Sequence, residues 1–290
     1  MKDTNVLISA GADINKSLEL LGDMNMYDEV LNDFLNLIDE KIANLNKYKS
    51  INDMANYAID VHSLKSDVRY LGFMKVGDLA YELELLSKAN DIAGVSAKHD
   101  NLMIEVSKIV SACKKYLYGK DDSKTDETII NEILSTPSEM DPMSQAIIYQ
   151  GTVTTEKKAQ SSSKQGVILI VDDSSVVANF IKKVFEKDYD VIIYSDGSGV
   201  IDYCANDEKR AKVKACLLDL NMPNVDGFEV LDFFKANNYF VKLPVVVISG
   251  VENIDTIERA KSYPIVEVLA KPFNERDCEM ALHKCLALYD

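Results

Sequence analysis

Five short apolar runs alternate with helix-like stretches throughout residues 167–290, and this alternation limits the fold more than any other feature of the chain. The runs are rich in Val, Ile and Leu, so strands formed from them would be buried on both faces. Such strands occur in parallel sheets that lie between two layers of helices. The five strands are expected at Val167–Val171, Val191–Tyr194, Ala215–Leu218, Val245–Ile248 and Val266–Leu269. We therefore predict a doubly wound α/β domain, a (βα)5 parallel sheet, in this part of the chain.

The N-terminal part of the chain, residues 1–118, has the apolar spacing of helices instead. Its apolar residues recur at steps of three and four, which places them on one face of a helix. Four such stripes are separated by short polar connections, and they begin at Tyr27, Met54, Val76 and Leu102. Four one-sided helices with short connections bury their stripes best as an antiparallel bundle. We therefore predict an all-α four-helix bundle here, preceded by a short helix near Asp13–Leu21.

Residues 119–166 differ in composition from both flanking parts. Thr155–Gln165 reads TEKKAQSSSKQ, a low-complexity run with little to bury. We predict a multidomain chain with a helical bundle at 1–118, a flexible linker at 119–166 and an α/β domain at 167–290. A flexible tether of ~48 residues would reach roughly 35–40 Å, because the mean reach of such a chain is ~5–6 Å × √n. We therefore expect the two domains of one molecule to be able to meet.

The chain is acidic, with 47 Asp and Glu residues against 32 Lys and Arg residues and a net charge of −15. Because nucleic acids and anionic membranes attract basic surfaces, this balance argues against both as partners. The apolar runs are far shorter than the ~20 residues that cross a bilayer, and no cleavable signal is visible. We expect a cytoplasmic protein with no nucleic-acid or membrane partner.

Polar residues follow four of the five predicted strands at the point where each strand ends. Asp172 and Asp173 follow the first strand, Asp219 the third, Ser249 the fourth and Lys271 the fifth. The carboxyl ends of parallel strands share one edge of the sheet, and ligands bind at that edge in open α/β sheets. We therefore expect these side chains to converge in one shallow pocket.

Carboxylates that lie this close repel one another, and a hard divalent cation removes the repulsion. Mg²⁺ suits the set, because it takes oxygen ligands from carboxylates and backbone carbonyls. One carboxylate could then act as a nucleophile toward phosphorus and form an aspartyl phosphate. The ammonium of Lys271 would meet the charge on the transferred phosphoryl group, and the hydroxyl of Ser249 could donate a hydrogen bond to it. The sequence thus predicts a Mg²⁺-dependent phosphoryl-transfer site.

The segments that carry these residues resemble a response-regulator receiver domain in both order and spacing. They read VDDSS at 171–175, LLDLNMPNVDG at 217–227, VISG at 247–250 and AKPF at 270–273. The resemblance covers all of 167–290, and it implies a flavodoxin-like receiver fold.

The same resemblance implies a role for each residue at the acidic edge. Asp219 would be the phosphoacceptor. The ligands of Mg²⁺ would be Asp172, Asp173, Asp219 and the backbone carbonyl of Asn221. Ser249 and Lys271 would contact the phosphoryl group, and the Lys271–Pro272 peptide bond would be cis. The chain departs from the family at Val268, three residues before the lysine, where many members carry Tyr or Phe as a rotamer switch.

A second candidate site is His62, on the helix predicted to begin at Met54. His62, Lys65, Ser66 and Arg69 form a polar stripe roughly opposite the apolar one. We therefore expect His62 to be exposed on the helix surface. An exposed imidazole can attack phosphorus, and the charge of Lys65 would partly offset that of the resulting phosphoimidazole.

The segment VHSLKSDVRYLG at 61–72 resembles the signature of histidine-phosphotransfer (HPt) domains, in which a lysine follows the histidine after three positions and a glycine after ten. The segment GADINKSLELLGDMNMYDEVLNDF at 11–34 resembles the opening of that family, and the resemblance covers about residues 7–118. The chain departs from the family at Ser66, where glycine is common. The resemblance implies that His62 accepts and donates a phosphoryl group.

These features predict a phosphorelay signalling protein that accepts a phosphoryl group on Asp219, on His62 or on both. It would pass the group between a sensor histidine kinase and a downstream response regulator or other phosphorelay protein. The chain has no glycine-rich ATP loop, so a separate kinase must supply the phosphate. We expect no enzyme in the usual sense, only Mg²⁺-dependent self-phosphorylation from a phosphodonor and slow self-dephosphorylation at Asp219.

Two other functions fit parts of this pattern. In a regulated binding module, phosphorylation of Asp219 would alter the receiver surface or its docking on the bundle, and the bundle would recruit a partner without phosphorylation of His62. In a metal-dependent phosphatase, the same acids would act on small molecules, but the shallow pocket lacks a substrate-capping insertion. Acid lability separates a relay from a binding module, because phosphohistidine is lost in acid whereas aspartyl phosphate is lost in base.

Overall fold

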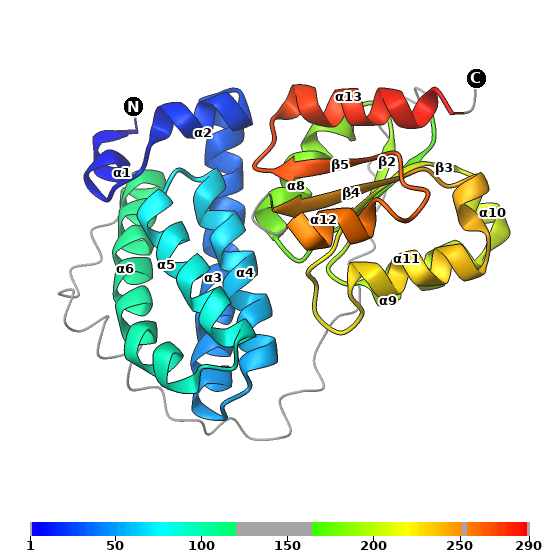
Figure 1. Cartoon of the computed structure of the whole chain (residues 1–290). Helices are drawn as coiled ribbons and strands as arrows, with labels where there is room; N and C mark the ends of the chain where they lie inside the picture. The colour runs from blue at the N-terminus through cyan, green and yellow to red at the C-terminus, as the bar shows by residue number, and fades with distance from the viewer. Residues whose placement is uncertain (1, 120–163, 251–253, 289–290) are drawn as a thin grey trace, which may run out of the picture.

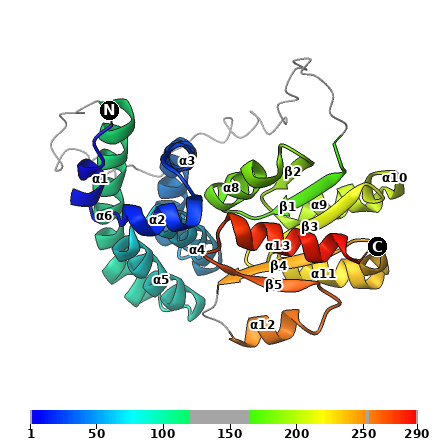
Figure 2. The ribbon, with the colours of Figure 1, turned by 90° about the horizontal axis from the view of Figure 1, so that it is seen from above.

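The computed structural model describes residues 2–119, 164–250 and 254–288. The predicted linker lies almost entirely outside the described residues. Residues 2–119, the helical region, contain helices and their connections, and the part from 164 to 288, the sheet region, contains a sheet with helices around it. The two regions lie side by side (Figures 1 and 2).

Six helices make up the described part of the helical region. They are α1 (Asn5–Ser9), α2 (Ile14–Leu21), α3 (Met24–Ser50), α4 (Met54–Tyr70), α5 (Met74–Lys88) and α6 (Ile92–Tyr118). The four predicted long helices correspond to α3 to α6 and the predicted leading helix to α2, whereas α1 was not predicted. Aspartate side chains accept hydrogen bonds from the first backbone N–H groups of four of them, and these are Asp13, Asp23, Asp53 and Asp91.

The apolar stripes seen in the sequence are the buried faces of these helices. On α3, for example, the stripe from Tyr27 through Phe34 to Leu45 is buried. Helices α3 and α5 each lie against both α4 and α6, so the four stripes meet in a shared core. Helix α4 is different, because every residue from Val61 to Val68 is buried. A helix that is buried all round must be covered on its polar side as well.

The sheet region consists of five strands and the helices between them. The strands are β1 (Val167–Val171), β2 (Asp190–Tyr194), β3 (Val213–Asp219), β4 (Val245–Gly250) and β5 (Glu267–Lys271). The helices are α8 (Ser175–Phe185), α9 (Gly197–Ala205), α10 (Asp207–Arg210), α11 (Gly227–Ala236), the 3-10 helix η2 (Tyr239–Val241), α12 (Ile254–Ala260) and α13 (Glu275–Leu286). All five predicted strands are present, and each differs from its expected bounds by two residues or fewer at either end.

All strand pairs are parallel, and the strands lie in the order β2-β1-β3-β4-β5. Alternate residues of β1 point to opposite faces: Ile170 joins the core beneath α8 and α13, whereas Leu169 joins the core beneath α9 and α11 (Figure 1). Both faces of the central strands are therefore buried. The predicted doubly wound, flavodoxin-like sheet is confirmed.

The core beneath α8 continues into the helical region, because α8 lies against α3 and α4. Tyr70, at the end of α4, lies in this interface between the two regions. Its ring centroid lies 5.9 Å from that of Phe180 on α8 and 5.9 Å from that of Phe273, which follows β5. The helical region thus covers α8 and the carboxyl edge of the sheet, where the predicted site lies.

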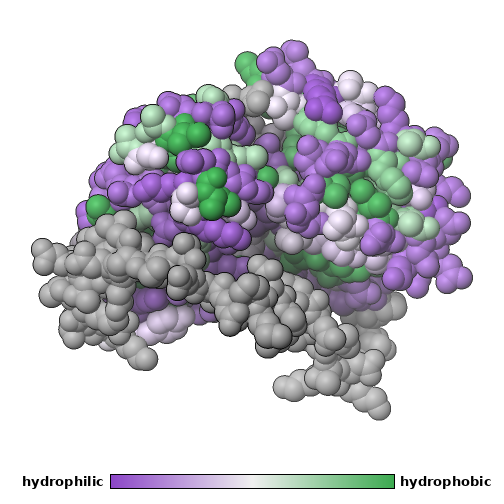
Figure 3. All heavy atoms as spheres, turned by 90° about the horizontal axis from the view of Figure 1, so that it is seen from below, coloured by the Kyte–Doolittle hydropathy of each residue, from purple (hydrophilic) through white to green (hydrophobic). Residues whose placement is uncertain are grey.

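Within the residues that the structure describes, no helix is long and apolar enough to cross a membrane. The coloured part of the face drawn in Figure 3 is mostly hydrophilic, with small groups of hydrophobic residues among the polar ones. Scattered hydrophobic residues of this kind are normal on a folded protein.

Candidate functional site

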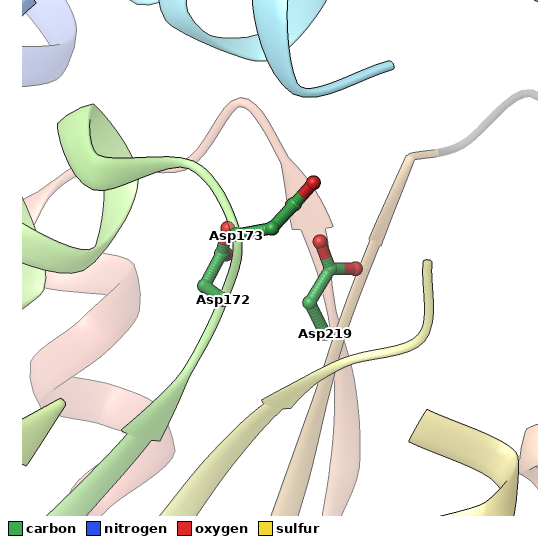
Figure 4. Close-up of side chains that lie close together, drawn as sticks. All are labelled: Asp172, Asp173 and Asp219. Carbon is green, nitrogen blue, oxygen red and sulfur yellow. The ribbon is translucent and has the colours of Figure 1, made fainter. Parts of the chain in front are cut away.

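Three carboxylates meet at the carboxyl edge of the sheet. Asp172 and Asp173 follow β1, and Asp219 is the last residue of β3. One oxygen of each lies within 4.8 Å of an oxygen of the other two. In Figure 4 the side chains of Asp173 and Asp219 point into the same space beyond the strand ends. The structure therefore brings together the three acids that the sequence placed at this edge.

Lys271 completes the cluster from the end of β5. Its Nζ lies 2.8 Å from Oδ2 of Asp172 and 2.8 Å from Oδ2 of Asp219. The Lys271–Pro272 peptide bond is cis, as expected from the sequence. Ser249 lies near the end of β4, where it is buried and donates to the backbone carbonyl of Gly250 at 3.3 Å.

The loop after β3 holds the carboxylate of Asp219 in place. The backbone N–H of Leu220 donates to its Oδ1 at 2.7 Å, and that of Asn221 donates to the same atom at 3.4 Å. The chain then turns back so closely that a Cβ atom on Gly227 would overlap the backbone oxygen of Asp219. Only glycine fits there, which explains the glycine that ends the LLDLNMPNVDG segment. Asn221 itself is half-buried.

Burial and like charges perturb the acids of the cluster. Burial raises the pKa of Asp172 to about 7, although the charge of Lys271 opposes the shift. Burial and the neighbouring carboxylates of Asp219 and Asp172 raise the pKa of Asp173 well above its usual range. For Lys271, burial would lower the pKa, but attraction to the surrounding carboxylates outweighs it and raises the pKa. A single buried cation therefore does not balance three carboxylates.

The residues present fit a divalent metal ion. Oδ1 of Asp173 is buried and has no hydrogen-bond partner among the described residues, although a buried carboxylate oxygen normally has one. The three acids offer only oxygen donors, which hard cations such as Mg²⁺ and Ca²⁺ prefer. A divalent cation held by Asp172, Asp173 and Asp219 would also offset the negative charge that Lys271 leaves unbalanced.

The prediction that His62 is exposed is wrong. His62 shows only 4 % of its surface to solvent, and Lys65 and Ser66 on the same stripe are also buried. Glu84 of α5 covers part of this stripe, and the ends of β4 and β5 in the sheet region cover another part. Helical spacing predicts that a polar face is solvated, and it detects neither a charged partner on a neighbouring helix nor a second region that packs on that face.

The buried imidazole of His62 is held by Glu84 of α5, which the sequence analysis missed. Oε1 of Glu84 lies 2.8 Å from Nδ1 of His62 and 2.6 Å from Nζ of Lys88, and Oε2 lies 2.8 Å from Nζ of Lys65. Burial alone would raise the pKa of Glu84, but the hydrogen bond and charge of His62 and the charges of both lysines lower it. An ionised carboxylate can only accept, so Nδ1 of His62 carries a proton and donates it. When the imidazole is in its neutral form, this arrangement leaves the lone pair on Nε2, the atom that can make a nucleophilic attack.

His62 lies beside the acidic edge of the sheet, because it lines two gaps between the regions. One gap, of about 20 Å³, is also lined by Gly250 at the end of β4 and by Lys271 and Pro272. The other, a cleft of about 400 Å³, is also lined by residues of the loop that follows Asp219, namely Leu220, Asn221, Met222 and Asp226. The imidazole therefore faces the neighbours of Asp219 and Lys271 on two sides.

His99, a second buried histidine, has a different environment. It lies on α6, where its Nδ1 is 3.0 Å from the hydroxyl of Tyr57 and its Nε2 is 2.7 Å from Oδ1 of Asn46. Burial lowers its pKa to about 4, so it stays neutral at ordinary pH. Both ring nitrogens are occupied within the helical region, and His99 is a structural residue.

Comparison with known proteins gives matches to the sheet region. Residues 168–283 match the model of the response regulator receiver domain family. A protein of Methanothrix harundinacea that is described as a probable methanogenesis regulatory protein, FilR2, is 31% identical over 123 residues, which cover 41% of this chain and 79% of that protein. Response regulator Rcp1 of Synechocystis is 30% identical over 125 residues, which cover 41% of this chain and 85% of that protein.

Solved structures match the same part of the chain. The chemotaxis response regulator CheY4 of Vibrio cholerae is 21% identical, and the match covers 42% of this chain and all (100%) of that one with a TM-score of 0.38.

Proposed function

The chain belongs to the response regulator receiver domain family through its C-terminal sheet region, and from this premise we propose that it is a phosphorelay protein in which Asp219 and His62 exchange a phosphoryl group. Membership makes the chain part of two-component signalling. It also implies a phosphodonor, such as a histidine kinase, and a downstream partner. The relay, the metal and the roles of single residues are our proposal.

Asp219 is the proposed phosphoacceptor. Its carboxylate oxygen would attack phosphorus as the bond from phosphorus to the leaving group breaks, and the leaving group would depart with the electron pair. Lys271, whose Nζ is 2.8 Å from Asp219, would hold a phosphoryl oxygen, and the hydroxyl of Ser249 would turn to donate to another. When bound by Asp172, Asp173, Asp219 and the backbone carbonyl of Asn221, Mg²⁺ would neutralise charge on the phosphoryl oxygens.

His62 is the proposed second acceptor, and we propose that the helical region is an HPt bundle. The observation that carries this proposal is that His62 lines both gaps beside the phosphoacceptor, next to Lys271 on one side and Asn221 on the other. Glu84 would keep the proton on Nδ1 and leave Nε2 as the nucleophile. Lys65 would offset part of the charge of the phosphohistidine. The proposed partners are a sensor histidine kinase and a downstream response regulator or other phosphorelay protein.

The burial of His62 favours a second candidate function, a phosphorylation-regulated binding module. In that case the receiver acts as a switch, the helical region docks a partner, and His62 is never phosphorylated. The two functions differ in the stability of the phosphate formed. A relay yields some phosphate that is lost in acid and survives base, whereas the binding module yields only phosphate that is lost in base.

Removal of Mg²⁺ tests the proposed phosphoacceptor site. We expect the full chain to take up label from a small phosphodonor, such as acetyl phosphate, in the presence of Mg²⁺ and to take up none after chelation. The carboxylates repel one another without a cation, so the nucleophile and the phosphoryl oxygens would lack charge neutralisation. Labelling followed by separate acid and base treatments measures both the amount of phosphate and its type. Labelling that is insensitive to the chelator would contradict the proposal.

A substitution at Lys271 separates metal binding from transfer. Lys271→Ala is expected to slow labelling from a small phosphodonor by about 10²–10³-fold, because it removes a charge that stabilises the transition state. Mg²⁺ affinity, measured by titration calorimetry, should not fall, because the cluster loses the positive charge of Lys271 and no longer has a cation that competes with Mg²⁺ for the carboxylates. The control is Lys284→Ala on α13, where the lysine is exposed and pairs with Glu267. An unchanged labelling rate in Lys271→Ala would remove this residue from the mechanism.

A further inference from the structure

A polar network from the helical region holds the loop that follows β1. Oγ of Ser63 on α4 donates to the backbone carbonyl of Asp173 at 3.1 Å, and Oγ of Ser174 donates to Oδ1 of Asp67 at 2.5 Å. Nζ of Lys41 on α3 supports both contacts, because it donates to Ser63 at 2.8 Å and to the other oxygen of Asp67 at 2.5 Å. The helical region therefore makes hydrogen bonds to the loop after β1, which carries Asp172 and Asp173, two of the three acids.

Tyr70 holds the loop that follows β5 on the opposite side of the pocket. Its hydroxyl accepts a hydrogen bond from the backbone N–H of Phe273 at 3.1 Å and donates one to the carbonyl of the same residue at 3.3 Å. Its ring packs on Phe180 and Phe273. Phe273 is two residues beyond Lys271, so this contact fixes the segment that carries the phosphoryl-binding lysine. We call Lys41, Ser63, Asp67 and Tyr70 the docking surface.

Two acids of the pocket, Asp219 and Asp172, are buried where the helical region docks on the sheet region. Asp219 has no exposed surface, and only 2 % of Asp172 is exposed. The contacts of the docking surface lie on loops at two sides of the pocket, and His62 lines the two gaps between the regions. A phosphodonor from outside must reach the carboxylate of Asp219 in line with its leaving group. The contacts of Ser63 and Tyr70 hold α4 against the loops that border this approach.

We propose that the docking surface is a gate over Asp219, which is closed when the helical region binds the acidic edge of its own receiver. In the closed state His62 lies beside Asp219 as its phosphotransfer partner, and phosphodonors from solution are excluded. In the open state an outside phosphodonor reaches Asp219. The part that concerns His62 rests on the proposed relay, whereas exclusion from the pocket rests only on the buried acids and the contacts around them.

Ser63→Arg tests the gate in the full chain. A long, charged side chain has no room against the carbonyl of Asp173 in the closed state, but it can reach solvent when the regions separate. The matched control is Ser96→Arg. Ser96 is exposed on α6, and among the described residues the main contacts of α6 are with α1, α3 and α5. Tyr70→Phe is a milder second variant, since it removes two hydrogen bonds across the interface and keeps the ring. Small-angle X-ray scattering reports separation of the regions.

We expect Ser63→Arg to have a larger radius of gyration and to take label from acetyl phosphate and Mg²⁺ at least about fivefold faster than the wild type and Ser96→Arg. Its fraction of acid-labile phosphate should fall, because His62 leaves the pocket. Tyr70→Phe should shift both quantities in the same direction by less. A folded Ser63→Arg chain that labels at the wild-type rate overturns the gate, whether or not it expands.

Failure of the proposed function gives a different result. If no chain takes up phosphate, the gate is judged by Mg²⁺ affinity in titration calorimetry. A rise of at least about fivefold in Ser63→Arg and none in Ser96→Arg supports a closed pocket. Equal affinities in all three chains overturn it.

Discussion

Asp219→Asn is expected to abolish the base-labile phosphate that the wild-type chain takes from a small phosphodonor in Mg²⁺. The loss should be at least about 10³-fold, because an amide cannot replace the nucleophilic carboxylate. The fold should survive, since the backbone N–H of Leu220 can still donate to the side-chain oxygen and Lys271 keeps Asp172 as a partner. Labelling and acid or base treatment of the full chain measure the effect.

The matched control for this variant is Asp232→Asn. Asp232 is exposed on α11, where it accepts a hydrogen bond from Tyr263, and it is outside the acidic cluster. Its substitution should leave labelling unchanged. Base-labile phosphate on Asp219→Asn at the wild-type level would mean that another side chain is the acceptor.

His62→Gln is expected to remove all acid-labile, base-stable phosphate and to leave labelling of Asp219 in place. Glutamine has no imidazole nitrogen that can form a phosphoimidazole. We expect a loss in the free energy of unfolding of only about 1–2 kcal/mol, because Glu84 keeps Lys65 and Lys88 as partners and can accept from the glutamine amide. Helical circular dichroism and chemical denaturation measure that loss.

The exposed His283 on α13 supplies the control, since His283→Gln should change neither the label nor the stability. If His62→Gln retained acid-labile phosphate, the relay would not pass through this histidine. If wild type and His62→Gln both carried only base-labile phosphate, the binding module would be the better description.

The acidic edge could be predicted because its geometry follows from local pattern alone. A run such as Val167–Val171 is buried on both faces only within a parallel sheet, and parallel strands all end at the same edge. Once the strands were placed, Asp172, Asp219 and Lys271 had to converge. The tight turn at Gly227 was part of the same segment, although its role in supporting Asp219 became clear only from the close approach of the backbone.

The environment of His62 could not be predicted in the same way. Its stripe on α4 is polar, and polarity at helical spacing normally indicates a solvated face. The cover comes from α5 and from a region more than 100 residues away in the chain, as the contact of Ser63 with Asp173 shows. Whether two regions pack on each other depends on how well their surfaces match. Neither the helical spacing of the N-terminal part nor the strand pattern of the C-terminal part describes that match.

Glu84 and Lys41 were missed for a related reason. Each is a charged residue next to an apolar stripe, which is ordinary for an amphipathic helix. Burial is what distinguishes Glu84, and its two lysine partners and one histidine partner come from α4 and α5. Glu84 directly follows Leu83 of the third stripe and precedes Leu85, which is half exposed, so the sequence pattern alone does not show that Glu84 is buried.

Passage of one phosphoryl group from Asp219 to His62 within a single chain can be followed directly. The full chain is labelled briefly from a radioactive small phosphodonor in Mg²⁺, freed of donor, and sampled over time for base-labile and acid-labile phosphate. Two protein concentrations about a hundredfold apart are compared, both far below the roughly millimolar effective concentration of a tethered pair. We predict that base-labile phosphate falls as acid-labile phosphate rises, at the same rate in both samples. Base-labile phosphate that decays without any acid-labile phosphate, or transfer that speeds up in proportion to concentration, would contradict exchange within the chain.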